Sequence, residues 1–192
     1  MDDRQARLTE VAGIAARLET ETGCPAQLLI AQWALESHWG ATPAGHANYF
    51  GIKRAARHTQ FCVVTTHEVY NAAQLASWNR NHSDHPARVV ETLPDGRVRV
   101  ELDDEFADYD SLADSCADYA WLITNGQPYQ KAWQRYLSDK NVDALVSSVA
   151  SVYATAPAYA QLATQIAGQQ NVLTALASAA GGGGPAAGGV VA

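Results

Sequence analysis

One stretch near the N-terminus constrains the fold more than any other, because it is apolar on nearly every side of a helix. The segment IAQWALESHWG, residues 30–40, holds two tryptophans and a single carboxylate, Glu36. We predict a helix that begins at Pro25, runs toward His38 and is ended by Gly40. A helix without a polar face must be central, so the rest of the chain has to surround it. Burying an unpaired charge is costly, so Glu36 is expected to be paired, neutralised or used.

Other segments of the chain have helical patterns and can pack around this central helix. Apolar residues at steps of three and four from Leu8 to Leu18 predict an amphipathic helix that stops at Gly23. In the second half of the chain, Asp110 is a candidate helix cap. The same periodicity predicts helices there over residues 112–123, 129–137, 142–153 and 157 to about 177.

The middle of the chain is typical of a small sheet. QFCVVTTHEV, residues 60–69, is dense in β-branched residues and predicts a strand, and residues 89–93 and 98–102 flank a Pro-Asp-Gly turn as a hairpin would. The polar stretch 72–87 between them is expected to be an irregular, exposed excursion. The fold class is therefore α+β, mainly helical, with a helical body, a small β-hairpin lobe at about residues 58–105, and a cleft between them.

Length and charge limit what the chain can do. Its 192 residues are enough for one buried core, which we place at residues 1–178, followed by a flexible Gly/Ala-rich tail at 179–192. A net charge of -7 provides no basic surface for nucleic acid or an anionic membrane. The N-terminus lacks the basic and apolar regions of a signal peptide, and no apolar run reaches the roughly 20 residues of a membrane span. We expect no nucleic-acid partner, no membrane insertion and no signal peptide.

Cysteines and histidines form no pattern typical of a metal site. Cys24, Cys62 and Cys116 are widely spaced and make no CxxC pair, which favours free buried thiols over a single bridge. His82 and His85 lie in a polar stretch without an HExxH arrangement. We therefore expect neither a metal nor a cofactor.

Five motifs, taken in order, resemble the glucosaminidase family of peptidoglycan hydrolases, glycoside hydrolase family 73. They are ALESHWG, NYFGIK, VVTTHEVYN, FADYDSLADSCADYAWL and YATAPAYAQL, within about residues 5–170. The resemblance implies a lysozyme-like fold that hydrolyses the β-1,4 bond between N-acetylglucosamine and N-acetylmuramic acid in peptidoglycan strands. The sequence departs from the family at Ala156, where aspartate is common, at Ala107, where a basic residue is common, and in an insertion after Glu68.

Hydrolysis of a glycosidic bond needs a proton for the leaving oxygen and a second group near the charged centre, roles that two carboxylates in different surroundings can fill. Glu36 lies among tryptophans near a helix end, where its pKa should rise, and is our general acid. The resemblance implies that Glu68 lies on the β-lobe across the cleft from Glu36 and acts as the base that activates water. It also implies that Tyr153 orients the acid or the substrate. The alternatives are a solvated strand-end glutamate and a core tyrosine. A carboxyl separation of about 5 Å favours retention and one of roughly 6.5 to 9.5 Å inversion, while attack by the substrate's own N-acetyl group is a third route.

The resemblance also assigns four residues to substrate binding: Asn48, Phe50, Trp39 and Tyr159. The amide of Asn48 suits an N-acetyl group, whereas core packing is the alternative for Phe50 because aromatic residues beside glycine usually pack. The acidic run 103–105 is interpreted as a solvated turn.

We therefore expect an endo-β-N-acetylglucosaminidase that acts in the periplasm or cell wall after delivery by a type VI-like secretion system, phage lysis or flagellar export. An antibacterial effector would imply a cognate immunity protein that plugs the cleft. The rival functions are a lytic transglycosylase or muramidase on the same fold, and a non-catalytic glycan-binding or virion module.

Overall fold

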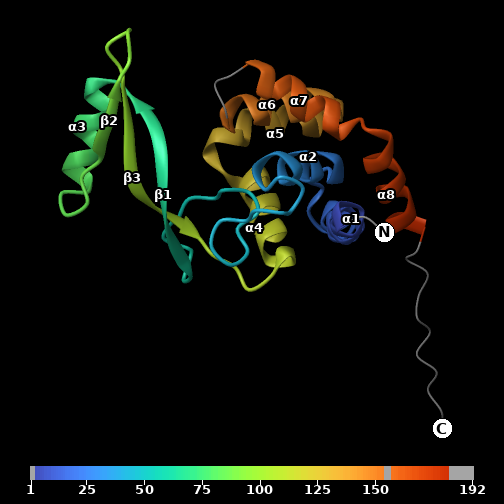
Figure 1. Ribbon diagram of the computed structural model, residues 1–192. Coiled ribbons are helices and arrows are strands. Elements are labelled where there is room, and N and C mark those ends of the chain that lie inside the picture. The colour runs from blue at the N-terminus through green and yellow to red at the C-terminus, as the bar shows by residue number, and fades with distance from the viewer. Residues whose placement is uncertain (1–2, 154–156, 182–192) are drawn as a thin grey trace.

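The computed structural model describes residues 3–153 and 157–181, and it shows a helical body with a small sheet at one side (Figure 1). The helices are α1 (Asp3–Thr22), α2 (Ala26–Glu36), α3 (Ala72–Asn81), α4 (Leu112–Asn125), α5 (Gln130–Asp139), α6 (Val142–Tyr153), α7 (Pro157–Ala167) and α8 (Gln170–Gly181), with a short 3-10 turn, η1 (Gln127–Tyr129). The strands are β1 (Phe61–Tyr70), β2 (Arg88–Thr92) and β3 (Val98–Ala107). The predicted mainly helical α+β class is confirmed. None of the described helices has the length and apolar character needed to cross a bilayer.

Helix α2 is the centre of the body, as its composition predicts. It contacts α1, α4, α6, α7 and α8. Leu28, Ile30 and Trp33 are fully buried, and the polar side chain of Gln32 is buried among them. Each large apolar side chain removed from water in this way contributes roughly 1.5 to 3 kcal/mol, so the fold is built around this helix.

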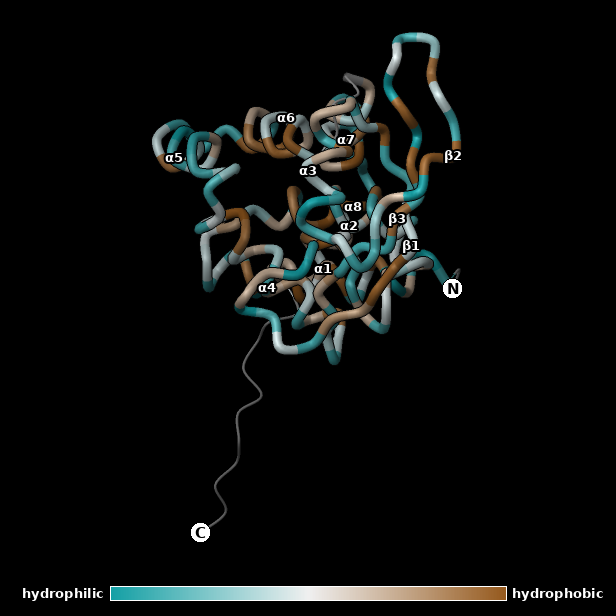
Figure 2. The backbone as a smooth tube through the Cα atoms, turned by 90° about the vertical axis from the view of Figure 1, so that its left-hand side faces the viewer, coloured by the Kyte–Doolittle hydropathy of each residue, from teal (hydrophilic) through white to brown (hydrophobic). Residues whose placement is uncertain are grey.

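The β-lobe is an antiparallel sheet in the order β1-β3-β2. The predicted hairpin is confirmed, and its hydrophilic turn projects away from the helical body (Figure 2). In the β1-β3 pair, Val64 lies opposite Asp104 and Glu68 lies opposite Val100. Since strand side chains alternate, these four residues share one face of the sheet.

Two expectations about the lobe were wrong. The stretch predicted to be an irregular excursion contains α3, whose first turn is closed by a capping box between Asn71 and Gln74. Its helical character was hidden because the helix has no buried face. The acidic run 103–105 lies within β3 rather than in a turn, because Asp104 and Glu105 bond to Lys53 and Arg54 of the neighbouring segment.

Two helix boundaries in the body also differ from the predictions. Ser111, rather than Asp110, caps α4 by accepting a hydrogen bond from the backbone N–H of Asp114. The single helix predicted from residue 157 is divided at Gly168 into α7 and α8. The expected tail at 179–192 overlaps the end of α8 at Gly181, and residues 182–192 lie outside the described part of the chain, as does Ala156.

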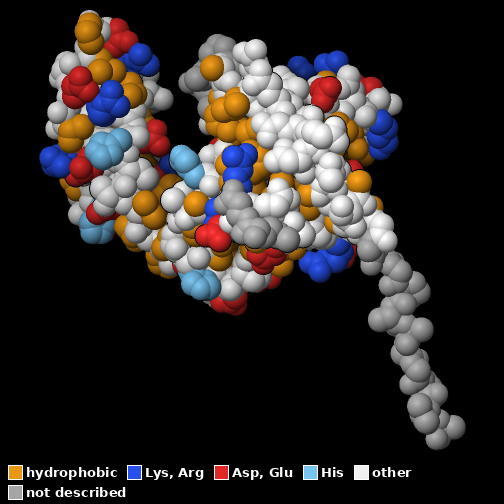
Figure 3. Space-filling view, turned by 45° about the vertical axis from the view of Figure 1, so that its right-hand side comes forward, with side chains coloured by type: hydrophobic (Ala, Val, Ile, Leu, Met, Phe, Trp, Pro, Cys, Tyr) orange, Lys and Arg blue, Asp and Glu red, His pale blue; other side chains and the backbone are white. Residues whose placement is uncertain are grey.

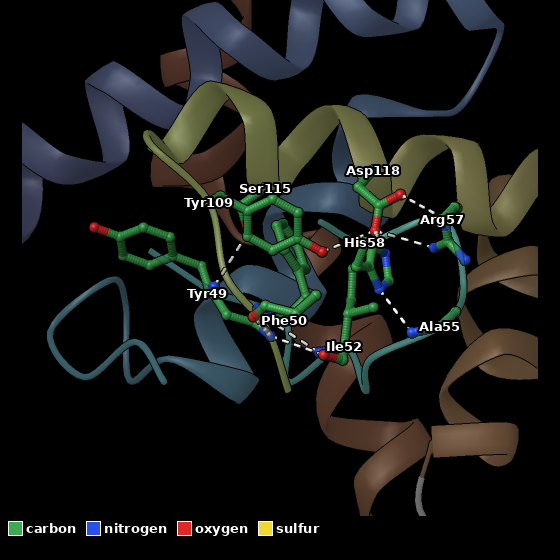
Figure 4. A network of polar contacts seen from close by, with 11 residues as sticks. Tyr49, Phe50, Ile52, Ala55, Arg57, His58, Tyr109, Ser115 and Asp118 are labelled. Atoms are coloured by element: carbon green, nitrogen blue, oxygen red, sulfur yellow. Dashed lines mark hydrogen bonds and ion pairs between the residues drawn. The ribbon is translucent and has the colours of Figure 1, made fainter. Parts of the chain in front are cut away.

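Two carboxylates tie the lobe to the body. Asp108, just after β3, accepts hydrogen bonds from the backbone N–H groups of His46, Ala47 and Tyr109. Asp118 of α4 accepts hydrogen bonds from Arg57 at 3.0 Å and from Tyr109 at 2.8 Å (Figure 4).

The same Asp118 carboxylate lies 3.0 Å from Nε2 of His58, whose other ring nitrogen accepts a hydrogen bond from the N–H of Ala55. Burial alone would raise the pKa of Asp118, but the hydrogen bonds from Arg57, Tyr109 and His58 outweigh it and hold the pKa below its usual range. The segment between the two lobes is thus fixed by charged hydrogen bonds rather than left as a loose linker.

All three cysteines lie in the described part of the chain and are free thiols, as predicted. Burial raises the pKa of Cys24 to about 12. Cys116 is also buried, and burial raises its pKa as well. Such thiols behave as small apolar side chains and not as nucleophiles.

Candidate functional site

The molecule is hollowed between the β-lobe and the helical body (Figure 3). One cavity in this region, of about 290 Å³, is lined by Gly51, Ile52, Lys53, Ala55, Arg57, Leu122, Pro128, Tyr129 and Tyr153. The lining comes from the NYFGIK loop and the segment after it on one side, and from the ends of α4 and α6 with η1 on the other.

Glu36 is the last residue of α2; it does not line this cavity itself but lies next to Gly51, which does. A Cβ atom at Gly51 would lie 3.7 Å from Oε2 of Glu36, so the glycine brings the loop backbone close to the carboxyl group. Among the described residues, Oε2 has no hydrogen-bond partner, while Oε1 is held by the body. The carboxyl group therefore has one fixed oxygen and one free oxygen.

A tight turn after α2 places this carboxyl group at the helix end. His38, Trp39 and Gly40 all have positive φ, and the Ser37 hydroxyl accepts from the N–H of Gly40. A Cβ atom at position 40 would come within 2.5 Å of the Trp33 ring, so glycine is needed there for space as well as for conformation.

Tyr159 of α7 connects Glu36 to the core. Its hydroxyl is hydrogen-bonded to Oε1 of Glu36 and lies 2.9 Å from Oε1 of Gln32, which is four residues earlier on the same face of α2. A hydroxyl has one proton, so it donates to only one of these acceptors at a time. When Glu36 is ionised the proton serves Glu36, and when Glu36 is protonated the hydroxyl can accept from Glu36 and donate to Gln32. Tyr159 can therefore hydrogen-bond both forms of the acid.

The surroundings of Glu36 raise its pKa. Burial disfavours the charged carboxylate and is the largest cause, while the hydrogen bond from Tyr159 acts in the opposite direction. The net shift is upward, which is what a group needs if it is to hold a proton at a pH where ordinary glutamates are ionised.

Replacing Tyr159 with phenylalanine is expected to raise the pKa of Glu36 further, because the variant keeps the burial and loses the hydrogen bond to the carboxylate. If protonated Glu36 is the active form, the alkaline limb of the pH–rate profile should move to higher pH. Tyr136→Phe, a half-buried tyrosine of α5 without a contact to Glu36, is the matched control. An alkaline limb that stays in place or moves to lower pH would contradict the assignment.

Tyr153 is placed at the cavity with Tyr129, a residue that the sequence analysis did not single out. Their rings stack with centroids 6.1 Å apart. Burial, followed by the charges of Tyr129 and Glu36, raises the pKa of Tyr153 well above its ordinary value. The tyrosine that contacts the Glu36 carboxyl group directly is Tyr159, and the catalytic role of Tyr153 stays a prediction.

The structure gives Asn48 a different role from the expected one. Its Nδ2 donates to the carbonyl groups of Ile52 and Ala107, and its Oδ1 accepts from the N–H groups of Phe50 and Ile52. These four bonds use the whole capacity of a buried amide, so no donor remains for a sugar. Asn48 holds the cavity loop in place.

Phe50 and Trp39 also lie away from the cavity lining. Phe50 is fully buried and stacks on Tyr119 with centroids 4.3 Å apart, so the packing alternative is the correct one. Trp39 packs edge-on against Trp33, and the guanidinium group of Arg4 lies 3.6 Å from its ring centroid. This tryptophan covers the side of α2 that faces α1.

No cluster of three or more potential metal ligands occurs in the part of the chain that the structure describes. The polar groups at the site include the carboxyl group of Glu36, the phenol groups of Tyr159, Tyr153 and Tyr129, and the amide of Gln32.

Comparison with known proteins adds the family. The sequence pattern of the glucosaminidase family, described as mannosyl-glycoprotein endo-beta-N-acetylglucosaminidase, matches residues 12–172. The chain belongs to the glucosaminidase family. Comparison with curated protein sequences finds no match.

Solved structures resemble this glucosaminidase over most of its length. The catalytic domain of the autolysin Auto from Listeria monocytogenes is 21% identical, with a TM-score of 0.65, and the match covers 91% of this chain and 88% of that one. A peptidoglycan hydrolase mutant from Sphingomonas sp. A1 is 25% identical, with a TM-score of 0.61 and coverage of 91% and 99%. The glycoside hydrolase domain of FlgJ from Salmonella typhimurium, truncated at its C-terminus, is 22% identical, with a TM-score of 0.56 and coverage of 86% and 95%. The expected lysozyme-like fold is confirmed.

In this glucosaminidase, Glu68 lies on β1 with its side chain on the sheet face that also carries Asp104. Asp104 is ion-paired with Lys53, a residue of the cavity lining. Burial raises the pKa of Tyr70 on the same strand, and the charges of Glu68 and Asp104 raise it further. The role of Glu68 as base stays a prediction.

The sequence analysis of this glucosaminidase missed Gln32, Tyr129 and Lys53. Gln32 had a readable signal, because an amide four residues before a buried carboxyl group lies on the same helix face. Tyr129 and Lys53 had none, because their positions depend on how η1 and the NYFGIK loop meet across the cavity.

Proposed function

We propose that this chain hydrolyses peptidoglycan as an endo-β-N-acetylglucosaminidase, with Glu36 as the general acid. The observation that carries the proposal is the Glu36 carboxyl group itself, which is half-buried beside a cavity and has a raised pKa; Tyr159 holds one of its oxygens, and the other has no hydrogen-bond partner within residues 3–153 and 157–181. Such a group can hold a proton and deliver it to a leaving sugar oxygen. The family gives the bond class, and the peptidoglycan hydrolase from Sphingomonas sp. A1 gives the substrate class.

In this mechanism, Glu36 carries its proton on Oε2 when substrate is bound and donates it to the glycosidic oxygen, while the Tyr159 hydroxyl donates its hydrogen bond to Oε1. The negative charge then receives a hydrogen bond at the moment it forms, without movement of the backbone. Tyr153 and Tyr129 form the apolar wall that limits water on this side of the cavity.

Digestion of purified sacculi tests the function. Mass spectrometry of the soluble products should find N-acetylglucosamine at the new reducing ends, with one water added per cleavage. Reducing ends of N-acetylmuramic acid would mean a muramidase, and anhydro sugars would mean a lytic transglycosylase. Release of sugars from a mannosyl glycoprotein but not from sacculi would overturn the substrate class, and binding without cleavage would make the chain a glycan-binding module.

We also propose Glu68 as the base that activates water, supported by its place on the same sheet face as Asp104, whose ion-pair partner Lys53 lines the cavity. Glu68→Gln is expected to lower the rate on sacculi by roughly 100-fold or more, since a positioned base contributes roughly 100- to 10,000-fold. Glu91→Gln, on the exposed strand β2, is the matched control. A Glu68 variant with full activity would leave the second role to the substrate's own N-acetyl group.

Delivery as an antibacterial effector, by phage lysis or by flagellar export, and the existence of an immunity protein, stay predictions. Affinity capture with this chain as bait, from cells that express the neighbouring genes, tests for such an inhibitor. A captured protein supports the effector hypothesis only if it also blocks the digestion of sacculi.

A further inference from the structure

A second, larger cavity lies on the β-lobe. It has a volume of about 680 Å³, within the range of ordinary ligand sites. Its lining consists of Lys53, Arg54, Val63, Trp78, His82, Asp84, His85, Asp103, Asp104 and Glu105. Lys53 also lines the cavity beside Glu36, so the two hollows are neighbours along the same face of the molecule.

The aromatic part of this lining comes from α3, within the insertion where the sequence departs from its family. Trp78 and His82 stack with ring centroids 3.8 Å apart, which gives the helix a flat aromatic surface at its C-terminal end. The packing of Trp78 against Tyr70 ties this surface to β1.

The charged residues of the lining differ in whether they have an ion-pair partner. Lys53 and Arg54 are each ion-paired, with Asp104 and Glu105 respectively. Asp84 and Asp103, by contrast, have no ion pair with a lysine or arginine anywhere in residues 3–153 and 157–181, although the Asp103 carboxylate does accept a hydrogen bond from Thr65 at 2.7 Å.

This arrangement selects a kind of ligand. Among the described residues, Asp103 has no ion pair and Asp84 is paired only with the His85 ring, at 3.8 Å, so these carboxylates can attract an ammonium group, while the Lys53 and Arg54 side chains can attract a carboxylate. An uncharged sugar would gain little from either. The peptide stems of peptidoglycan carry both groups, a free amine and carboxylates, on a flexible chain beside the glycan.

We propose that this cavity is a subsite for the peptide stem of peptidoglycan, with Asp103 and Asp84 receiving its amino group. The proposal rests on the proposed function, because the stem comes within reach only when a peptidoglycan strand occupies the neighbouring cleft. In this proposal the β-lobe binds the peptide part of the polymer, whereas Glu36 acts on the sugar part.

The test compares three substrates made from the same sacculi: strands with native stems, strands whose stem amines have been N-acetylated, and strands stripped of their peptides. Acetylation removes the cation and keeps the peptide. The wild type should lose about tenfold in kcat/KM when the amines are acetylated, as expected for the loss of one charge-assisted hydrogen bond. Asp103→Asn should show the same loss on native strands and no further loss on acetylated ones.

Asp143→Asn, an exposed aspartate at the start of α6, is the matched control and should behave as the wild type on all three substrates. Equal activity of Asp103→Asn and wild type on native strands would overturn the proposal. The proposal would also be overturned if Asp103→Asn lost the same factor in kcat/KM on peptide-free strands as on native ones, because that result would indicate a sugar subsite or a disturbed lobe. A wild type that cleaves none of the three substrates would instead refute the proposed function.

Discussion

Replacing Glu36 with glutamine is expected to lower the rate of sacculus hydrolysis by roughly 100- to 10,000-fold, the usual contribution of a positioned general acid. Glutamine keeps the size of the side chain and its contact with Tyr159, but it cannot donate a proton to a leaving oxygen. The initial rate of reducing-end release from purified sacculi measures the effect.

Glu21→Gln, an exposed glutamate near the end of α1, is the matched control and should keep full activity. A Glu36 variant that retains more than a tenth of the wild-type rate would remove Glu36 from the role of acid.

The same substitution is expected to stabilise the protein at neutral pH. The pKa of Glu36 in the folded protein lies above the ordinary value of 4.5. As pH rises past that ordinary value, the unfolded chain loses its proton first, so the free energy of unfolding falls until the folded pKa is passed. Urea unfolding at pH 4 and pH 7 should show a gain in stability for Glu36→Gln that is larger at pH 7.

The second large effect is expected from Asn48→Ala. The substitution removes four buried hydrogen bonds: the N–H groups of Phe50 and Ile52 lose their acceptor and the Ala107 carbonyl loses a donor, whereas the Ile52 carbonyl keeps the hydrogen bond from the N–H of Ala107. Each buried group left unsatisfied costs about 1 to 3 kcal/mol, and the loop can relax in part. We therefore expect the free energy of unfolding to fall by about 4 kcal/mol.

Activity should fall with stability in this variant, because the loop that Asn48 holds brings Gly51 next to Glu36. Urea unfolding measures the first effect and the sacculus assay the second. Asn125→Ala, whose exposed amide bonds to the Trp121 carbonyl at the end of α4, is the matched control. Similar stabilities of the two variants would show that the Asn48 network is not what holds the loop.

The sequence could predict α2 because its lack of a polar face leaves only a central position. It also predicted the hairpin around Pro-Asp-Gly, since that turn needs nothing beyond its neighbours. Helix α3 was missed because periodicity reports burial, and this helix has no buried face. Its signal was the Asn71–Gln74 capping box, which the polar composition of the stretch obscured.

In the candidate site, too, local sequence predicts some features, whereas others depend on contacts that form only in the folded chain. Glu36 was found because a lone carboxylate in an apolar helix is conspicuous wherever the rest of the chain goes. Asn48 was assigned to the substrate because an amide in a glycine-rich loop suits a sugar equally well; the four backbone groups that it bonds come from residues up to Ala107 and are brought together only by folding. The meeting of Tyr159 with Glu36 likewise joins α7 to α2 across the core.

The ties at Asp108 and Asp118 have a consequence for how such proteins can diversify. Both lie where the chain leaves the lobe and enters α4, so the strands and α3 form an appendage mounted on a fixed base. Insertions at α3 and at the hairpin turn can be lengthened, shortened or exchanged during evolution while Glu36 on α2 and Glu68 on β1 keep their places. Bacteria that alter the decoration of their walls would then be matched by changes in these outer parts of the lobe.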